Sequence, residues 1–221
     1  MAQCVLVMGD SGSGKSASLR NFEPNEISIF NVTNKRLPFK KKLPMKQNCS
    51  YKDIAEGLSN PTKRAYVIDD ATYLMVFESF DRAQETGFTK FTEMAKKFRD
   101  MLDFINTQVP DDVIVYITMH TEADATTSKI KAKTIGKMID EQLKLEGLFT
   151  TVIRAIHNED GYKFVVKDDM VSTAKSPMDM FDTDMVDNDL KAIDKIIREY
   201  YDMPALDAKT TKTTKTKAEE K

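Results

Sequence analysis

The amino-acid sequence predicts an α/β fold in which helices pack on a mostly parallel central sheet. Residues 4–8 form a short, continuous apolar run that ends at a glycine-rich turn, which is typical of a buried parallel strand. Further apolar runs alternate with stretches of helical periodicity, and this alternation favours a parallel sheet. Later in the chain, an Asp-Gly pair separates two apolar runs and predicts a closing antiparallel hairpin.

The expected strands are short and strongly apolar, and turn residues follow most of them. We place them at residues 4–8, 27–32, 65–68, 113–119, 151–156 and 162–166. Helices are expected at residues 16–22, 51–58, 74–108 with a break near Gly87, and 190–201. The long helical stretch carries an apolar stripe opposite its charges, so we expect that stripe to cover the sheet.

The length of 221 residues fits one domain with extensions. We assign the domain to residues 1–204, with a core at about 3–167, an acidic segment at 168–189 and a C-terminal helix at 190–202. Residues 205–221 are rich in lysine and threonine and have no large apolar side chain after Leu206. We therefore expect a disordered tail there.

The composition excludes several classes of protein. Hydrophobic residues make up 41% and charged residues 31%, which excludes collagen-like and wholly disordered chains. No apolar run approaches the ~18 residues that a membrane span needs, and the first apolar run lacks the charged segment of a signal peptide. Cys4 and Cys49 alone make neither a disulfide framework nor a zinc site. We therefore expect a cytoplasmic protein that does not associate with a membrane.

Residues 9–16 match the phosphate-binding pattern G-x-x-x-x-G-K-[ST] and lie between an expected strand and an expected helix. Glycines let the backbone turn so that its N–H groups face a phosphate, and the helix dipole favours the same anion. The pattern predicts that ATP is bound by Gly9, Asp10, Ser11, Gly12, Ser13, Gly14, Lys15, Ser16 and Ala17. Lys15 would contact the β- and γ-phosphates as a catalytic group, and the Ser16 hydroxyl would bind Mg²⁺.

A second motif supports this interpretation. Residues 65–69 form an apolar strand that ends in a carboxylate, so Asp69 is expected to hold Mg²⁺ together with Ser16. Asp70 follows directly and is a candidate to orient or deprotonate the attacking water. Because a helix begins just after it, Asp70 could instead be the N-cap of that helix.

The strand at residues 113–119 ends in polar side chains. In open α/β sheets, ligands bind at the carboxyl ends of the strands. Thr118 or His120 could therefore sense the γ-phosphate, by a hydrogen bond or by the charge of a protonated histidine. A histidine at this place could also be an ordinary loop residue.

These motifs together resemble the RecA-like P-loop ATPase core, with its mostly parallel sheet and closing hairpin. The stretches at 35–40 (KRLPFK), 88–93 (FTKFTE) and 173–177 (TAKSP) further resemble phage-encoded AAA-type ATPases grouped with the Sak-type single-strand annealing and recombination proteins. The resemblance covers residues 3–182. It implies ATP hydrolysis coupled to single-stranded DNA, a homo-oligomer, a single-strand binding protein as a further partner, and the host cytoplasm as the location.

The net charge of −2 conceals two basic segments at 35–46 and 129–137. In RecA-like proteins the loop after the fourth strand contacts DNA, which here is residues 121–135. The DNA contacts implied are those of Lys129, Lys131 and Lys133, with Lys40, Lys41 and Lys42 in the other segment. Lysines of this kind suit backbone phosphates. Either segment could equally be a solvated loop.

The sequence departs from the RecA-like pattern in two ways. Residues 31–35, after the second strand, hold no carboxylate where a catalytic glutamate is common. No arginine finger stands out, although Arg154 and Arg198 are candidates and a second copy could supply one in trans. Two alternatives therefore stay open: a P-loop kinase of nucleotides or small molecules, and a non-hydrolysing, ATP-gated DNA-binding or loader module.

Overall fold

The computed structural model describes residues 2–135 and 144–206. Within these residues, the central element is an eight-stranded sheet in the order β10-β9-β8-β1-β5-β4-β2-β3. The strands are β1 (Gln3–Met8), β2 (Ile27–Asn31), β3 (Met45–Lys46), β4 (Ala65–Asp69), β5 (Ile114–Met119), β8 (Thr151–Asn158), β9 (Gly161–Val165) and β10 (Met185–Asp187). The strands from β8 to β3 in this order pair in parallel, and β9 and β10 are added antiparallel.

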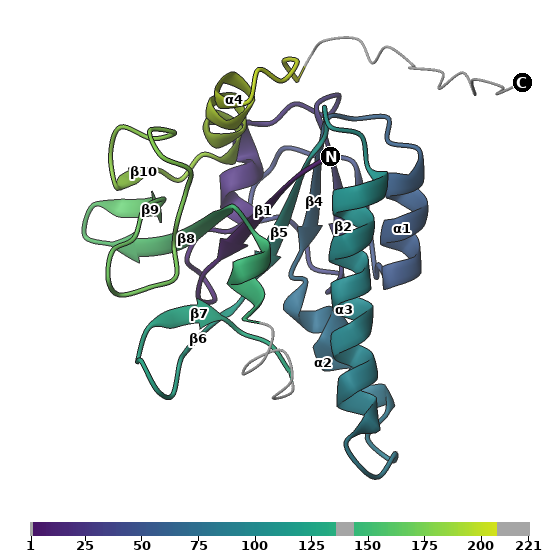
Figure 1. Cartoon of the computed structure of the whole chain (residues 1–221). Helices are drawn as coiled ribbons and strands as arrows, with labels where there is room; N and C mark the ends of the chain where they lie inside the picture. The colour runs from purple at the N-terminus through teal and green to yellow at the C-terminus, as the bar shows by residue number, and fades with distance from the viewer. Residues whose placement is uncertain (1, 136–143, 207–221) are drawn as a thin grey trace, which may run out of the picture.

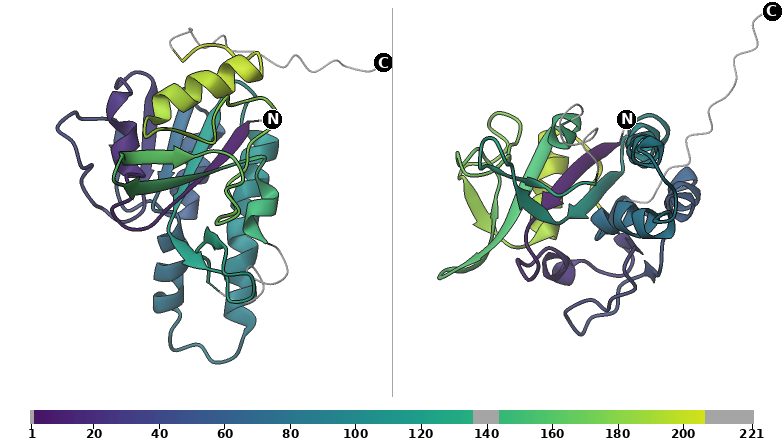
Figure 2. Two further views of the ribbon diagram at one scale, coloured as in Figure 1. Left: turned by 90° about the vertical axis from the view of Figure 1, so that its left-hand side faces the viewer. Right: turned by 90° about the horizontal axis from the view of Figure 1, so that it is seen from below.

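Helices cover both faces of the sheet (Figures 1 and 2). They are η1 (Ser16–Asn21), α1 (Tyr51–Ser59), α2 (Thr72–Asp81), α3 (Thr89–Gln108), η3 (Leu145–Leu148) and α4 (Leu190–Tyr200). One face packs against α1, α2 and α3, and the other packs against η1 and α4. The result is a three-layer α/β/α arrangement with the sheet in the middle.

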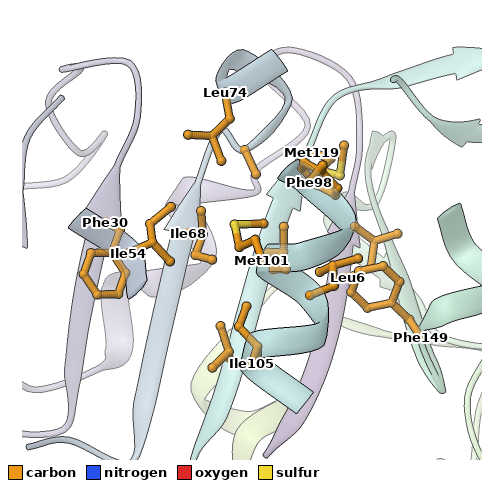
Figure 3. Close-up of a cluster of buried hydrophobic side chains, with 14 of the residues drawn as sticks. Leu6, Phe30, Ile54, Ile68, Leu74, Phe98, Met101, Ile105, Met119 and Phe149 are labelled. Atoms are coloured by element: carbon orange, nitrogen blue, oxygen red, sulfur yellow. The ribbon is translucent and has the colours of Figure 1, made fainter. Parts of the chain in front are cut away.

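The alternation of side chains along β1 shows how the two layers are held. Leu6 and Met8 point into the cluster beneath α3, whereas Val5 and Val7 point into the cluster beneath α4. Figure 3 shows Phe98 and Ile105 of α3 lying over the sheet. A strand that is buried on both faces in this way reads as a continuous apolar run, which is the pattern that the sequence carries.

A second, two-stranded sheet follows β5 along the chain. It is an antiparallel hairpin of β6 (Thr121–Ala123) and β7 (Ile130–Ala132). In Figure 1 this hairpin and the tip of the α2–α3 pair lie below the carboxyl ends of the parallel strands. The hairpin was expected only as a loop.

The expected strands agree with the structure to within about two residues at each end, and the antiparallel β8–β9 pair is present. One helix differs, because the stretch expected at 16–22 is a six-residue 3₁₀ helix. The stretch expected at 74–108 is interrupted near Gly87 as predicted, which gives the two helices α2 and α3. Gly87, at φ +85°, lies in the turn between them. The chain needs this left-handed residue to reverse direction.

The acidic segment 168–189 packs against the sheet and adds one strand to it. It contributes β10, and Asp187 forms an ion pair with Lys163 of β9 at 2.7 Å. Asp189 is the N-cap of α4, where its carboxylate accepts hydrogen bonds from two backbone N–H groups. These aspartates therefore have structural partners.

Of the expected tail, residues 207–221 lie outside the described residues. Across 2–135 and 144–206, the structure has no helix that is both long enough and apolar enough to cross a membrane.

Candidate nucleotide-binding site

Four neighbouring parallel strands bring the predicted motifs together. In the sheet order, β1 is followed by β5, β4 and β2, so the loops after these strands meet at one edge. A cleft of about 290 Å³ lies there. Its walls include Ser11, Gly12 and residues 14–17 of the phosphate loop, Asp69 and Asp70 after β4, and His120 after β5.

The phosphate loop depends on two glycines in the left-handed region, Gly12 at φ +80° and Gly14 at φ +98°. Lys15 folds back over this loop, and its Nζ donates to the carbonyl oxygens of Gly9 at 2.6 Å and Asp10 at 2.8 Å. Its side chain is 94% buried, since only 6% of the residue is exposed, and this burial lowers the pKa of Lys15. The ammonium is thus held at the base of the cleft.

Three of the predicted nucleotide-binding residues shape the loop and do not line the cleft. A Cβ at Gly9 would lie 2.7 Å from the carbonyl oxygen of Ala155, so the neighbouring strand requires glycine there. Asp10 is exposed, and its carboxylate accepts a hydrogen bond from Thr121. Ser13 is buried, and its hydroxyl has no hydrogen-bond partner among the described residues.

The short helix after the loop gives less electrostatic help than the sequence suggested. A six-residue 3₁₀ helix, η1, aligns few peptide dipoles. Its start is fixed by hydrogen bonds, because Ser18 donates from its N–H to Gly14 at 3.0 Å and from its hydroxyl to Lys15 at 2.6 Å. Binding of an anion here depends on the loop amides and Lys15.

The two residues predicted to bind Mg²⁺, Ser16 and Asp69, lie in contact with each other. The Ser16 hydroxyl donates to the Asp69 carboxylate at 3.0 Å. Burial, together with the charge of Asp70, raises the pKa of Asp69. One hydroxyl and one carboxylate are hard oxygen ligands, and Mg²⁺ commonly takes one or two such protein ligands and completes its shell with phosphates and water. The described residues contain no group of three or more His, Cys, Asp or Glu side chains placed to hold a metal.

Thr118 lies beneath the two carboxylates and not in the cleft. It is fully buried, and its hydroxyl donates to Asp69 at 2.9 Å and accepts from the N–H of Asp70 at 2.8 Å. These two hydrogen bonds hold the Asp69 carboxylate and the backbone of Asp70 in position. Direct contact with a phosphate, which the sequence suggested for Thr118, is therefore not what its geometry supports.

Asp70 points into the cleft. It has a left-handed backbone at φ +61°, which is uncommon for aspartate. Its carboxylate accepts hydrogen bonds from the Thr33 hydroxyl at 3.1 Å and from Lys35 Nζ at 3.2 Å. The N-cap of α2 is Ala71, and no side chain caps that helix. The capping alternative for Asp70 is thus not the one that the structure shows.

His120, which follows β5, lies near the other oxygen of the Asp70 carboxylate from the one that Lys35 contacts. Its Nε2 lies 3.5 Å from the Asp70 carboxylate but makes no hydrogen bond to any described residue. Burial, and then the charge of Lys15, lowers the pKa of His120, so the imidazole is neutral near pH 7. A neutral ring can donate a hydrogen bond to a phosphate oxygen, whereas the charged form suggested by the sequence is disfavoured.

The six lysines proposed to contact DNA differ in their surroundings. Lys129 lies 3.7 Å from Asp168, and Lys131 lies 3.6 Å from Glu122. Lys41 forms an ion pair with Glu23 at 2.9 Å. The other three, Lys40, Lys42 and Lys133, are exposed.

The candidate arginine fingers also differ. Arg198 is 4% exposed and donates to Asp194 at 2.5 Å, so it cannot reach a site on a second copy. Arg154 lies 3.4 Å from Asp169.

The structure adds cleft residues that sequence reasoning missed. Lys35 and Arg36, after β2, line the cleft beside Asp70, and Tyr162 of β9 lines it beside Gly14. The basic pair could have been found from its position, since it follows a strand that pairs with the Asp69 strand. Nothing in the local sequence signals Tyr162, because it reaches the cleft through the closing hairpin.

The cleft fits a nucleotide with its metal. His120 Nε2, in the wall of the cleft, is buried and has no hydrogen-bond partner among the residues described, which is costly unless a ligand or water binds it. The Ser16–Asp69 pair offers oxygen ligands beside a lysine and a glycine turn. Anion-binding and cation-binding groups thus stand side by side.

Comparisons with known proteins add little beyond this geometry. The sequence matches no protein-family model and no curated protein. A solved structure of an ATPase from the type III secretion system of pathogenic bacteria is similar, with a TM-score of 0.44 and 13% sequence identity. The similarity covers 69% of this chain and 50% of that ATPase chain, so this chain spans half the length of that protein.

Proposed function

We propose that this chain binds Mg-ATP and hydrolyses it. The observation that carries the proposal is the convergence of Lys15, the Ser16–Asp69 pair and Asp70 on one cleft. The strand order supports the RecA-like core implied by the sequence resemblance. In that order β5, which precedes His120, lies between β1, which leads into the phosphate loop, and β4, which ends in Asp69, and the antiparallel β8–β9 hairpin follows beside β1.

Each side chain has a distinct part in the proposed reaction. Lys15 neutralises phosphate charge, and Ser16 and Asp69 hold the metal. When bound, Mg²⁺ supplies charge neutralisation at the phosphate oxygens. Asp70 accepts a hydrogen bond from the attacking water and takes its proton, and neutral His120 donates to an oxygen of the transferred group.

The test combines an equilibrium measurement with turnover. Lys15→Ala is expected to weaken ATP binding and to lower phosphate release by at least about 100-fold. Asp70→Asn is expected to keep ATP affinity within about threefold and to lose about 10²–10⁴-fold in turnover, the usual contribution of a general base. Asp100→Asn on α3, which is remote from the cleft, is the control. Turnover by Asp70→Asn at the wild-type rate would remove Asp70 from the mechanism.

We further propose that single-stranded DNA is the partner of this ATPase. Exposed Lys40, Lys42 and Lys133 support it, because cations suit backbone phosphates. Lys40 and Lys42 follow the cleft residues 35, 36 and 38 along the chain, and the N–H of Lys133 donates to the carbonyl oxygen of His120, which lines the cleft. Replacing all three by glutamine is expected to weaken binding to an oligonucleotide. The slope of the logarithm of the binding constant against the logarithm of the salt concentration should become shallower by about 0.7 for each lost phosphate contact. Replacing Lys96 and Lys195, on α3 and α4, is the control for charge.

The alternatives give different results in the same assay. DNA-stimulated turnover that fades with salt supports the DNA proposal. Turnover that ignores DNA but transfers phosphate to a nucleoside monophosphate would favour a kinase. Tight ATP binding without phosphate release, with or without DNA, would favour a nucleotide-gated binding module. Self-assembly and a single-strand binding protein as partner stay predictions.

A further inference from the structure

We propose that Lys35 supplies, from within the same chain, the cation that neutralises the transferred phosphoryl group. The inference rests on the proposed hydrolysis and goes beyond it. RecA-like enzymes were expected to borrow such a cation from a neighbouring copy. Here the segment after β2, which lacks a carboxylate, carries a lysine into the cleft instead.

The backbone of this segment is fixed by a buried side chain. Asn31 ends β2 and is 1% exposed. Its Oδ1 accepts a hydrogen bond from the N–H of Thr33 at 3.0 Å, and its Nδ2 donates to the carbonyl oxygen of Lys35 at 2.7 Å. Asn34, between these contacts, has a left-handed backbone at φ +58°. One amide thus closes a tight turn that directs Lys35 back towards the sheet.

The sheet register places this turn beside the catalytic carboxylate. Asn31 pairs with Asp69 in the parallel β2–β4 ladder, so the turn runs next to Asp70. Lys35 Nζ lies 3.2 Å from the Asp70 carboxylate and 5.2 Å from the centre of the Tyr73 ring. Its side chain is 63% exposed, so the ammonium can move within the cleft without breaking the packing.

The ion pair with Asp70 suits a resting site. A carboxylate that is paired with lysine is a weak acceptor for the proton of water. An entering terminal phosphate attracts the Lys35 ammonium, whose four-carbon stem is flexible, and this frees Asp70. Thr33 still holds the carboxylate in place at 3.1 Å.

The proposed chemical step is the attack of water on the γ-phosphorus of ATP. The oxygen of water forms a bond to the γ-phosphorus while the bond from that phosphorus to the β–γ bridging oxygen breaks. ADP leaves with the electron pair of the broken bond, and Asp70 takes the proton of the water. Lys35 and Lys15 then offset the negative charge on the transferred group from two directions.

The experiment compares Lys35→Ala with Lys96→Ala. The control removes another exposed lysine that pairs with an aspartate at nearly the same distance, Lys96 with Asp100 at 3.1 Å, on a remote helix. Lys35→Ala is expected to lower kcat about 100-fold with KM changed less than about threefold. Lys35→Arg is expected to restore part of that loss, and Arg36→Ala to change kcat much less than Lys35→Ala.

A binding measurement isolates the inference from turnover. Lys35→Ala is expected to bind ADP like the wild type, but to lose at least about tenfold of the extra affinity gained when aluminium fluoride mimics the transferred group. Mixing Lys15→Ala chains with Lys35→Ala chains distinguishes the source of the cation. A lysine acting within its own chain gives no recovery of turnover, whereas one acting on a neighbour restores it.

The outcomes separate the two proposals. If the wild type binds and hydrolyses ATP but Lys35→Ala matches it in kcat and in fluoride-dependent affinity, the inference is overturned and the ATPase stands. Recovery of turnover in the mixture overturns the assignment to the same chain. If the wild type binds no nucleotide, the proposed function fails, and the inference fails with it.

Discussion

Two clusters of buried charge lie at opposite ends of the parallel strands, here called the amino edge and the carboxyl edge of the sheet. They differ in how completely their charged groups are paired. At the amino edge, Arg198 of α4 donates to Asp194 at 2.5 Å and to the carbonyl oxygen of Arg64 at 2.8 Å. Tyr116 completes the group by donating to Asp194 at 2.8 Å. Each charged group there is held by several partners.

The carboxyl edge is built from similar residue types but is not closed. Lys15 Nζ donates to two backbone carbonyl oxygens, and Asp69 and Asp70 lie side by side. His120 Nε2 has no hydrogen-bond partner among the described residues, and Asp70 has a left-handed backbone. Burial of charge therefore does not by itself mark a functional site. Incomplete pairing and local strain do.

The largest expected effect on stability comes from opening the closed cluster. Arg198→Met leaves Asp194 buried without its cation, which is expected to lower the free energy of unfolding by about 3–5 kcal/mol. Lys15→Met, at the other edge, is expected not to lower it, because Lys15 is a buried ammonium without a bonded carboxylate. Urea unfolding of both variants measures the contrast. A loss below about 1 kcal/mol for Arg198→Met would mean that the two clusters do not differ in this way.

A smaller effect is expected in the phosphate loop, where two glycines allow a matched pair. Alanine at either Gly12 or Gly14 must adopt a left-handed backbone, at a cost of about 1–2 kcal/mol. At Gly14 a Cβ would also lie 2.9 Å from the Tyr162 ring and 3.0 Å from Asn188, whereas at Gly12 nothing lies within 4 Å. Gly14→Ala is therefore expected to destabilise the protein more than Gly12→Ala and to weaken ATP binding further.

Thermal unfolding and ATP titration of these two variants test the contact separately from the backbone. Gly161→Ala, also left-handed at φ +90° and with nothing within 4 Å, is the control outside the phosphate loop. Equal destabilisation by the Gly12 and Gly14 variants would show that Tyr162 and Asn188 move aside easily.

The parts of the molecule that sequence reasoning recovered are those with a local signal. The buried strands have continuous apolar runs, and residues 9–16 and 65–69 carry complete motifs, so their meeting at one sheet edge followed from parallel pairing. Tyr162 gave no such signal, and Lys35 had only its position after the second strand. Their place in the cleft depends on the turn closed by Asn31 and on the hairpin beside β1, which are tertiary features.

The same limit explains Thr118. Its position at the end of a strand suggested contact with a phosphate, but strand position does not determine which side of the carboxylates a side chain occupies. In the structure its hydroxyl lies under Asp69 and Asp70, where it is fully buried. Only the packed sheet reveals that it holds the two carboxylates and that His120 is the residue that borders the cleft.

The smallest expected effect is a pH dependence that comes from His120, whose Nε2 makes no hydrogen bond to a described residue. Burial and the charge of Lys15 lower the pKa of His120 below its ordinary value of 6.5. At pH values between the lowered pKa of His120 in the folded chain and its ordinary pKa of 6.5, the unfolded chain binds more protons than the folded one. The stability that depends on neutral His120 is therefore complete above pH 6.5 and is lost as pH falls. His120→Asn is therefore expected to show a smaller decrease in melting temperature from pH 7.5 to 5.5 than the wild type.

The corresponding change at the other histidine, His157→Asn on β8, serves as the control and should keep the wild-type difference. A bound nucleotide sharpens the test, because phosphate charge beside His120 favours its protonated form and should reduce the acid sensitivity of the wild type. The His120→Asn variant should show no such nucleotide-dependent change. If the wild type and His120→Asn lose the same stability between pH 7.5 and 5.5, His120 is not the group that makes the cluster at the carboxyl edge sensitive to acid.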